Sequence, residues 1–290
     1  MTGWGEMLLM DVGGNYIKYA RTGGDGKLRP ETFGELPSRA EEGPEEILSA
    51  FRQVIAEAKK EGAPERCAVS IPDPFDYETG TFRMKHKFTS VYGKSLRPLF
   101  AEEGMEVSFV QDTVAYMLGT STEGIFEGAS CPCLITLGTG VGFALMREGK
   151  VQVNRGRIPV PILWNAPYEE GITEDYVSTR AIQARYLPGY TVREIAARAR
   201  SGDPQARAAF RETGMHLARI LNRVTKEQGC DRIVLGGQIS KSADLLELRT
   251  EVPWILAANL DAPALHGLNV WQRMGQERCL RIVDAPEEKA

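Results

Sequence analysis

The sequence predicts an α/β protein made of two similar domains with a ligand cleft between them. One observation is an apolar run that ends in a glycine turn at residues 7–18 (MLLMDVGGNYIK), and another is a similar run at 134–143 (LITLGTGVGF). A second apolar run follows each turn, so both are typical of a β-hairpin. A helix and a buried strand then follow each hairpin, which repeats one plan twice.

In the first copy of this plan, strands joined by glycine turns precede a helix. Pro44 is suited to a first helical position, and apolar residues recur at helical spacing until Gly62 ends the pattern. The expected strands are 7–10, 17–22, 31–35, 67–71 and 107–110, and further helices are expected at 96–100 and 112–118.

In the second copy, a hairpin pattern begins at Cys133 and a third strand is expected at Val151. Helices are expected at about 172–186, 192–199 and 204–228, the last with Asp203 as N-cap and Pro204 as first residue. A buried strand at 233–235 runs into Gly236 and Gly237. We expect the first domain to span 1–110 plus about 271–290, and the second to span 111–270.

The composition excludes several classes of protein. A net charge of −4 leaves no electrostatic footprint for nucleic acid, and no apolar run approaches the roughly 20 residues that a membrane span needs. Asp11 interrupts the only apolar run near the start, so we expect no signal peptide. The five cysteines are scattered, and the one close pair, Cys131 and Cys133, is interpreted as reduced, partly buried thiols at the start of a strand. We expect a cytoplasmic location.

The two glycine turns are candidate phosphate-binding loops. Glycine lets a phosphate approach the backbone closely, and successive N–H groups can hold its oxygens. Neither turn has the spacing of a Walker A loop or of the dinucleotide-binding motif. Each turn alone is equally typical of an ordinary hairpin, so the interpretation depends on their occurring together.

The order of motifs resembles the ROK (repressor, open reading frame, kinase) family of the actin-like ATPase and sugar-kinase superfamily. The matching segments cover nearly the whole chain: Asp11–Lys18 is similar to the first phosphate motif, 71–80 to a Pro-Gly-Pro-Val-Asp and Glu-Thr-Gly segment, Gln111-Asp112 to Asn-Asp, 137–142 to the second phosphate motif, Glu174 and Ser178 to Glu-x-x-x-Ser, 235–240 to the adenosine motif, and 264–267 to Ala-x-x-Gly.

The resemblance implies two ribonuclease H-like (actin-like ATPase) domains and an ATP-dependent carbohydrate kinase. Its γ-phosphate acceptor would be a hydroxyl of a hexose or amino sugar, and we expect a homodimer. Asp112 is the implied catalytic base, and Asp11 would hold Mg²⁺ through water. The implied ATP-binding residues are Asp11, Gly13, Gly14, Asn15, Lys18, Gly138, Thr139, Gly140, Gly236 and Gly237, and the implied substrate-binding residues are Asp73, Gln111, Asn154, Arg157 and Glu174.

The chain also departs from the family pattern. Asn15 replaces a threonine, Gln111 an asparagine, Asn154 a sugar-binding glutamate, and Arg157 a histidine that binds zinc and sugar. The family's zinc cluster would lie between Arg157 and Glu174, where this sequence has no cysteine, so we expect no structural zinc. Arg157 is consistent with an acidic or acylated substrate, or with an ion pair on the pocket rim.

Purely structural roles stay open for these residues. Asp11 is suited to capping the first turn, Asp112 to capping a helix, and Glu174 to interacting with a helix dipole. Gly236 and Gly237 are equally consistent with tight strand-to-helix packing. A catalytically weak sugar-binding or regulatory protein without a DNA-binding domain is therefore the alternative. The first strand is expected by Met7, so a helix-turn-helix ahead of it is not expected.

Overall fold

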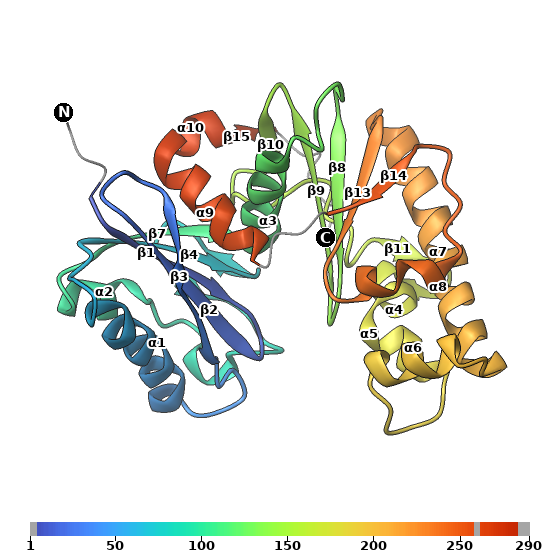
Figure 1. Ribbon diagram of the computed structural model, residues 1–290, viewed down its shortest axis with the longest axis horizontal. Coiled ribbons are helices and arrows are strands. Elements are labelled where there is room, and N and C mark those ends of the chain that lie inside the picture. The colour runs from blue at the N-terminus through green and yellow to red at the C-terminus, as the bar shows by residue number, and fades with distance from the viewer. Residues whose placement is uncertain (1–4, 258–261, 284–290) are drawn as a thin grey trace. The chain divides into compact units, whose positions relative to one another are not determined.

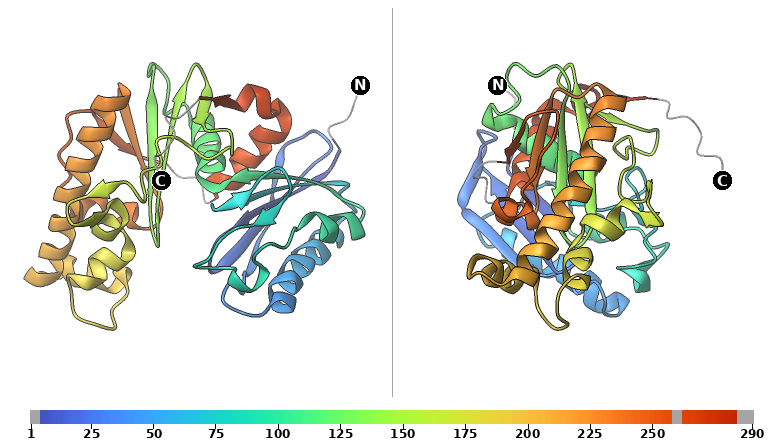
Figure 2. Two further views of the ribbon diagram at one scale, coloured as in Figure 1. Left: turned by 180° about the vertical axis from the view of Figure 1, so that it is seen from behind. Right: turned by 90° about the vertical axis from the view of Figure 1, so that its right-hand side faces the viewer.

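The computed structural model describes residues 5–257 and 262–283, which form two compact units (Figure 1; Figure 2). Among the described residues, the first unit comprises 5–124, 153–158 and 262–283, and the second comprises 125–152 and 159–257. Residues 111–124 therefore lie in the first unit, whereas the sequence predicts the second domain for them. Residues 284–290 of the predicted first domain lie outside the described residues, and the domain boundaries stay a prediction.

The first unit contains a mixed five-stranded sheet in the order β3-β2-β1-β4-β7. β1, β2 and β3 are antiparallel neighbours, whereas β4 and β7 extend the sheet in parallel with β1. The strands are β1 (Met7–Val12), β2 (Tyr16–Thr22), β3 (Leu28–Pro37), β4 (Arg66–Ile71) and β7 (Glu106–Gln111), and a small hairpin is formed by β5 (Phe75–Asp76) and β6 (Thr81–Phe82). β3 is longer than predicted at both ends.

Helices cover both faces of this sheet, as Figure 1 shows. Leu8 and Met10 of β1 belong to the same buried cluster as Phe51 of α1 (Pro44–Lys59). Side chains alternate along a strand, so Leu9 points to the opposite face, where α9 (Pro263–Met274) packs on β1. Burial on both faces explains the continuous apolar run of β1. The remaining helices are α2 (Arg97–Glu102), α3 (Asp112–Thr120), α10 (Gln276–Cys279) and the short 3-10 helices at Thr89–Val91 and Ser121–Glu123, and β15 (Leu280–Ile282) follows α10.

The second unit contains strands in the order β14-β13-β8-β9-β10. These are β8 (Pro132–Leu137), β9 (Val141–Arg147), β10 (Lys150–Val153), β13 (Arg232–Gly236) and β14 (Trp254–Leu256), with a small hairpin of β11 (Pro167–Tyr168) and β12 (Gly171–Ile172). The helices are α4 (Thr173–Val177), α5 (Thr179–Ala184), α6 (Val192–Arg200), α7 (Pro204–Gln228) and α8 (Ala243–Leu246), and a 3-10 helix spans Ile239–Ser242.

α7 has the predicted bounds because its ends are set by local capping. The Asp203 carboxylate accepts hydrogen bonds from the N–H groups of Gln205 and Ala206, and Gly229 ends the helix with a positive φ of 64°. The single helix predicted at 172–186 is wrong. The chain is extended at Ser178, which separates α4 from α5, and the N–H of Thr179 donates to the carbonyl of Gly138 at 2.8 Å.

The two sheets have the same strand order and the same strand directions. In each, a central strand has two antiparallel strands on one side and two parallel strands on the other. β1 of the first unit thus corresponds to β8 of the second, and β4 to β13. This duplication confirms the predicted α/β fold class with two similar halves, each beginning with a glycine hairpin.

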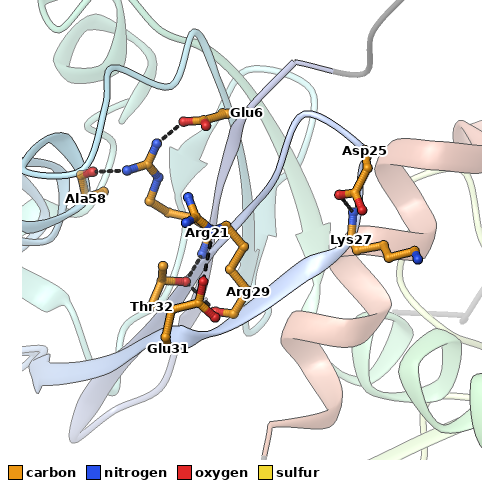
Figure 3. Close-up of polar contacts among 8 residues, drawn as sticks. All are labelled: Glu6, Arg21, Asp25, Lys27, Arg29, Glu31, Thr32 and Ala58. Atoms are coloured by element: carbon orange, nitrogen blue, oxygen red, sulfur yellow. Dashed lines mark hydrogen bonds and ion pairs between the residues drawn. The ribbon is translucent and has the colours of Figure 1, made fainter.

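A buried arginine joins β2 to two other segments of the first unit (Figure 3). Arg21 is 1% exposed, pairs with Glu6, and donates from Nη1 to the carbonyl of Ala58 at 2.9 Å. Its backbone N–H donates to the Thr32 hydroxyl at 2.8 Å. A buried guanidinium needs these partners because an unpaired charge in the interior is costly.

Two glycines allow α3 and α9 to pack closely. A Cβ atom at Gly119 would overlap the carbonyl of Pro263, and one at Gly267 would overlap the carbonyl of Ala115. Gly267 belongs to the Ala-x-x-Gly segment, so in this fold that glycine lets a helix approach α3. The contact fixes the position of α3, which begins with Asp112.

Other predictions from composition can also be compared with the structure. All five cysteines are buried free thiols, so Cys131 and Cys133 are more deeply buried than the partial burial predicted for them, and the Sγ atoms of Cys131 and Cys230 lie 3.8 Å apart. Among the described helices, none combines the length and apolar character that crossing a bilayer requires.

Arg21→Ala should lower the free energy of unfolding by about 1–3 kcal/mol, because it leaves the buried Ala58 carbonyl without its hydrogen-bond donor and the partly exposed Glu6 carboxylate without its ion-pair partner. Arg29→Ala is the control, since Arg29 and its partner Glu31 are both exposed and such pairs stabilise proteins little. Urea unfolding of both variants checks this. Equal losses of stability would contradict it.

Gly119→Ala should destabilise the protein by at least about 1–3 kcal/mol, because the added methyl group has to push α9 away from α3. Gly24→Ala is the matched control, since a Cβ atom there would meet nothing within 4 Å. Thermal melts of the two variants measure the difference. If Gly119→Ala has the same melting temperature as the wild type, the close contact between α3 and α9 does not require a glycine at this position.

Candidate functional site

The first glycine loop presents two backbone N–H groups to solvent. Between β1 and β2, the N–H of Gly13 donates to the carbonyl of Tyr16 at 2.8 Å and closes the turn. Ser38 binds the carbonyls of Gly14 and Asn15 through its hydroxyl and its N–H. Gly14 and Asn15 are exposed, and their N–H groups have no hydrogen-bond partner in the described part of the chain. The loop can therefore donate to an anion.

Asp11 lies near the end of β1, opposite Lys18 in the antiparallel register. The Ser70 hydroxyl donates to its Oδ1 at 2.6 Å. Burial raises the pKa of Asp11, while Ser70 and Lys18 act in the opposite direction. Asp11 is thus held by a hydrogen bond from Ser70 on the neighbouring strand β4. In the described structure it forms no hydrogen bond that caps the glycine turn.

Gln111 links two acidic residues of this unit, Asp73 and Asp112. It is the N-cap of α3: its Oε1 accepts from the N–H of Val114 at 2.9 Å. Its Nε2 donates to Asp73 at 3.0 Å and to Asp112 at 2.7 Å. The structure therefore brings the predicted residues Asp73, Gln111 and Asp112 together, and it gives the capping role to Gln111.

Asp112 is a carboxylate with a raised pKa. It is the first residue of α3, and its Oδ1 accepts from the N–H of Thr113 at 2.7 Å. Its pKa is raised to about 6, chiefly by burial. The charge of Lys87 acts to lower this pKa, whereas the charges of Asp73 and Asp11 act to raise it. A group with this pKa can hold and release a proton near neutral pH, which is what a general base requires.

Asn154 and Arg157 form a tight turn after β10. The Asn154 Oδ1 accepts from the N–H of Ile158 at 3.1 Å, and the N–H of Arg157 donates to the carbonyl of Asn154 at 2.9 Å. Arg157 has a φ of 64°, and its Nη1 donates to the carbonyl of Tyr77 at 3.4 Å. The Asn154 side chain thus shapes the turn that presents Arg157.

The second glycine loop connects β8 to β9 in the other unit. The N–H of Gly138 donates to the carbonyl of Gly140 at 3.0 Å, and Thr139 and Gly140 are exposed. Glu174 binds this loop: its Oε2 accepts from the N–H of Val141 at 3.2 Å, and its Oε1 pairs with Arg180 at 3.1 Å. Glu174 therefore supports the loop in this structure.

Gly237 follows β13 and touches the same loop region. It has a φ of 83°, and a Cβ atom there would overlap the backbone of Leu137. The close approach explains why this position is a glycine without reference to a ligand. It also places the predicted adenosine motif directly against the start of the second glycine loop.

Tyr168, Tyr176 and His216 form an aromatic cluster in the second unit. Tyr168 of β11 packs on Tyr176 of α4 with ring centroids 5.0 Å apart, and its hydroxyl lies 2.9 Å from Nδ1 of His216. Burial lowers the pKa of His216, which favours the neutral imidazole. In the described residues, no group of three His, Cys, Asp or Glu side chains is arranged to hold a metal ion.

Some residues of the site carry no signal in the sequence. Lys87 is the main example: it lowers the pKa of Asp112, and a Cβ atom at Gly14 would lie 3.9 Å from its Cδ. Lys87 lies in a loop without a recognisable motif. Ser70 was read from the sequence only as part of a buried strand, although it donates to Asp11.

Comparisons with known proteins point to one family. The model of the ROK family matches residues 168–274. The resemblance to the ROK family is confirmed. The Streptomyces griseus ROK family glucokinase in complex with glucose and AMPPNP has a TM-score of 0.72 at 19% identity, covering 93% of this chain and 100% of that chain. A ROK family transcriptional regulator, a homologue of the E. coli MLC protein, has a TM-score of 0.70 at 17% identity, covering 92% and 78%.

Two curated relatives are sugar kinases. An Escherichia coli N-acetylmannosamine kinase is 24% identical over 261 residues, which is 83% of this chain and 86% of the relative. The Thermotoga maritima glucokinase is 23% identical over 154 residues, which is 53% of this chain and about half of the relative, 48%. At these identities the solved structures show the fold, and the relatives support a sugar kinase of unspecified substrate.

Asp112→Asn should stabilise the protein at pH 8, by up to about 3 kcal/mol. The pKa of Asp112 is raised from 3.8 to about 6, so its protonated form is favoured in the folded state. Its contribution to stability is present below pH 4 and is lost as the pH rises through 6. Chemical unfolding at pH 4 and pH 8 measures the free energy of unfolding of both proteins. The difference between the variant and the wild type should be larger at pH 8 than at pH 4. A variant less stable than the wild type at pH 8 would contradict the inference that the charged carboxylate of Asp112 destabilises the folded protein.

Proposed function

We propose that this chain is an ATP-dependent kinase that phosphorylates a hydroxyl group of a hexose or an amino sugar. The observation that carries the proposal is Asp112, a carboxylate with a pKa raised to about 6 at the start of α3. Gln111 orients it, and Lys87 supplies a positive charge near it. The ROK resemblance and the sugar-kinase relatives support the same activity.

Each exposed glycine loop, taken by itself, has donors suited to a phosphate group. In the first unit these are the N–H groups of Gly14 and Asn15, which have no partner among the described residues, and in the second unit they belong to the exposed Thr139 and Gly140. When bound, ATP supplies the transferable phosphoryl group and Mg²⁺ neutralises its charge. Asp11 is the residue of this chain that would bind the metal, through water, since Ser70 already occupies one of its oxygens.

Asp112 would act on the acceptor. Its carboxylate accepts the proton of the sugar hydroxyl while the oxygen attacks phosphorus, and the Thr113 N–H and the Gln111 amide keep the accepting oxygen in place. Asp73, which shares the Gln111 amide with Asp112, is available to a second hydroxyl. Both roles use residues that lie together in one unit.

A sugar-binding or regulatory protein is the second candidate. It is favoured by Asn154, whose side chain is engaged in its own turn, and by Glu174, which is engaged with the second loop. Both positions were expected to contact the sugar. A ROK transcriptional regulator also shares the fold. This candidate predicts sugar binding without turnover.

Asp112→Asn should lower turnover by roughly 10²–10⁴-fold, because the amide cannot accept the hydroxyl proton. The wild-type rate should fall tenfold per pH unit below about pH 6, where Asp112 becomes protonated. ADP release, followed over a panel of hexoses and amino sugars, measures both effects. Near wild-type turnover of the variant would exclude Asp112 as the base.

The same variant should keep its affinity for the nucleotide. A thermal shift with Mg-AMPPNP reports binding to the folded protein by mass action, and it should be equal for Asp112→Asn and the wild type. A wild type that neither gains stability with Mg-AMPPNP nor releases ADP with any sugar would favour the regulatory candidate.

A further inference from the structure

A cavity in the first unit is lined by three arginines and two acidic residues. It has a volume of about 360 Å³, within the range of small-molecule sites. Its walls are residues 74–78, Arg83 and residues 155–158, which include Arg155 and Arg157. The cavity thus has three guanidinium groups and two carboxylates, those of Asp76 and Glu78.

The acidic residue Asp76 of this cavity faces Arg83. Asp76 accepts hydrogen bonds from the N–H groups of Glu78 and Thr79, at 3.0 Å and 2.9 Å, and these bonds and the charge of Arg83 lower its pKa. Arg83 and Arg157 form no ion pair within 4.0 Å of any carboxylate in the described part of the chain. Arg157 is therefore the cation of the cavity whose charge is least balanced by its own walls.

Arg157 is held in position before any ligand arrives. The turn closed by Asn154 fixes its backbone in the left-handed region, and the Tyr77 carbonyl accepts one N–H of its guanidinium. The other N–H groups of the Arg157 guanidinium have no partner among the described residues. A planar guanidinium fork fits the paired oxygens of a carboxylate or a phosphate.

The cavity adjoins the acidic residues of the candidate site. Pro74 in its wall follows Asp73 directly. Burial raises the pKa of Tyr77, another wall residue, and the nearby charges of Asp73 and Asp112 raise it further. One end of the combined site is thus acidic and accepts hydroxyl protons, whereas the other is cationic. A molecule with hydroxyls at one end and an anionic group at the other matches both ends.

We propose that the acceptor is an anionic sugar, whose carboxylate or phosphate group binds Arg157 and Arg83. The proposal rests on the kinase function proposed above and adds the substrate class. The two arginines orient the sugar so that a hydroxyl faces Asp112. Neutral hexoses lack the group that the cationic end recognises, so they bind more weakly.

Calorimetry without nucleotide tests this. The probes are glucuronate and mannuronate for the carboxylate, glucose 6-phosphate and mannose 6-phosphate for the phosphate, and glucose and mannose as neutral partners. At least one anionic sugar should bind about 10–100-fold more tightly than its neutral partner, and higher salt should reduce the gap. Neutral sugars that bind equally well, or no binding by any anionic probe, would overturn the proposal.

Variants assign the effect to the cavity. Arg157→Gln and Arg83→Gln should each weaken the binding of the anionic sugar by at least about tenfold more than that of its neutral partner, and Arg157→Lys should restore part of the affinity. Arg52→Gln, on the exposed side of α1, is the matched control. Arg83 is exposed, so its variant should fold even if an Arg157 variant does not.

The failure of the kinase function would look different. ADP release and the Mg-AMPPNP thermal shift report the kinase, whereas calorimetry reports the acceptor. Anionic binding without any nucleotide binding would remove the kinase and keep the anionic site. Turnover with neutral sugars alone would keep the kinase and remove the anionic site.

Discussion

The candidate site depends on the side-chain amide of Gln111. Its oxygen satisfies the first turn of α3, and its nitrogen joins the carboxylates of Asp73 and Asp112. Two carboxylates so close would repel each other, and a shared donor reduces that cost. A side-chain amide offers an acceptor and a donor in one planar group. At its other end α3 is fixed by a different constraint, the close contact of Gly119 with α9. The carboxylate of Asp112 is thus placed by one hydrogen-bonded end and one packed end.

Much of the fold could be predicted from the sequence, because its signals are local. The glycine hairpins follow from the turn residues, and α7 from its proline, its caps and its apolar stripe. The break at Ser178 could not be predicted, since the N–H of Thr179 donates to Gly138, a residue far away in the sequence. The length of β3 was missed for a similar reason: pairing with β2, rather than its own mixed composition, keeps it extended.

The site shows the same division. The sequence identified Asp112, but it could not tell which of two adjacent polar residues caps α3, because the extended backbone of Gln111 decides that. Asn154 was selected by its place in a motif, whereas its side chain closes a turn. Lys87 lies in a loop without periodicity, and only the fold brings it near Gly14 and Asp112. Roles that come from long-range proximity leave no local pattern.

The contact between Gly119 and α9 also has a consequence for the order of synthesis. α9 belongs to the first unit, although the whole of residues 125–259 separates it from α3 in the chain. At about 5–20 residues per second, a ribosome makes that stretch over roughly 7–27 s. During this interval the first unit exposes the face of α3 that α9 later covers, and Asp112 lies on a helix without its final packing partner. The nascent first unit therefore stays incomplete until α9 has been made.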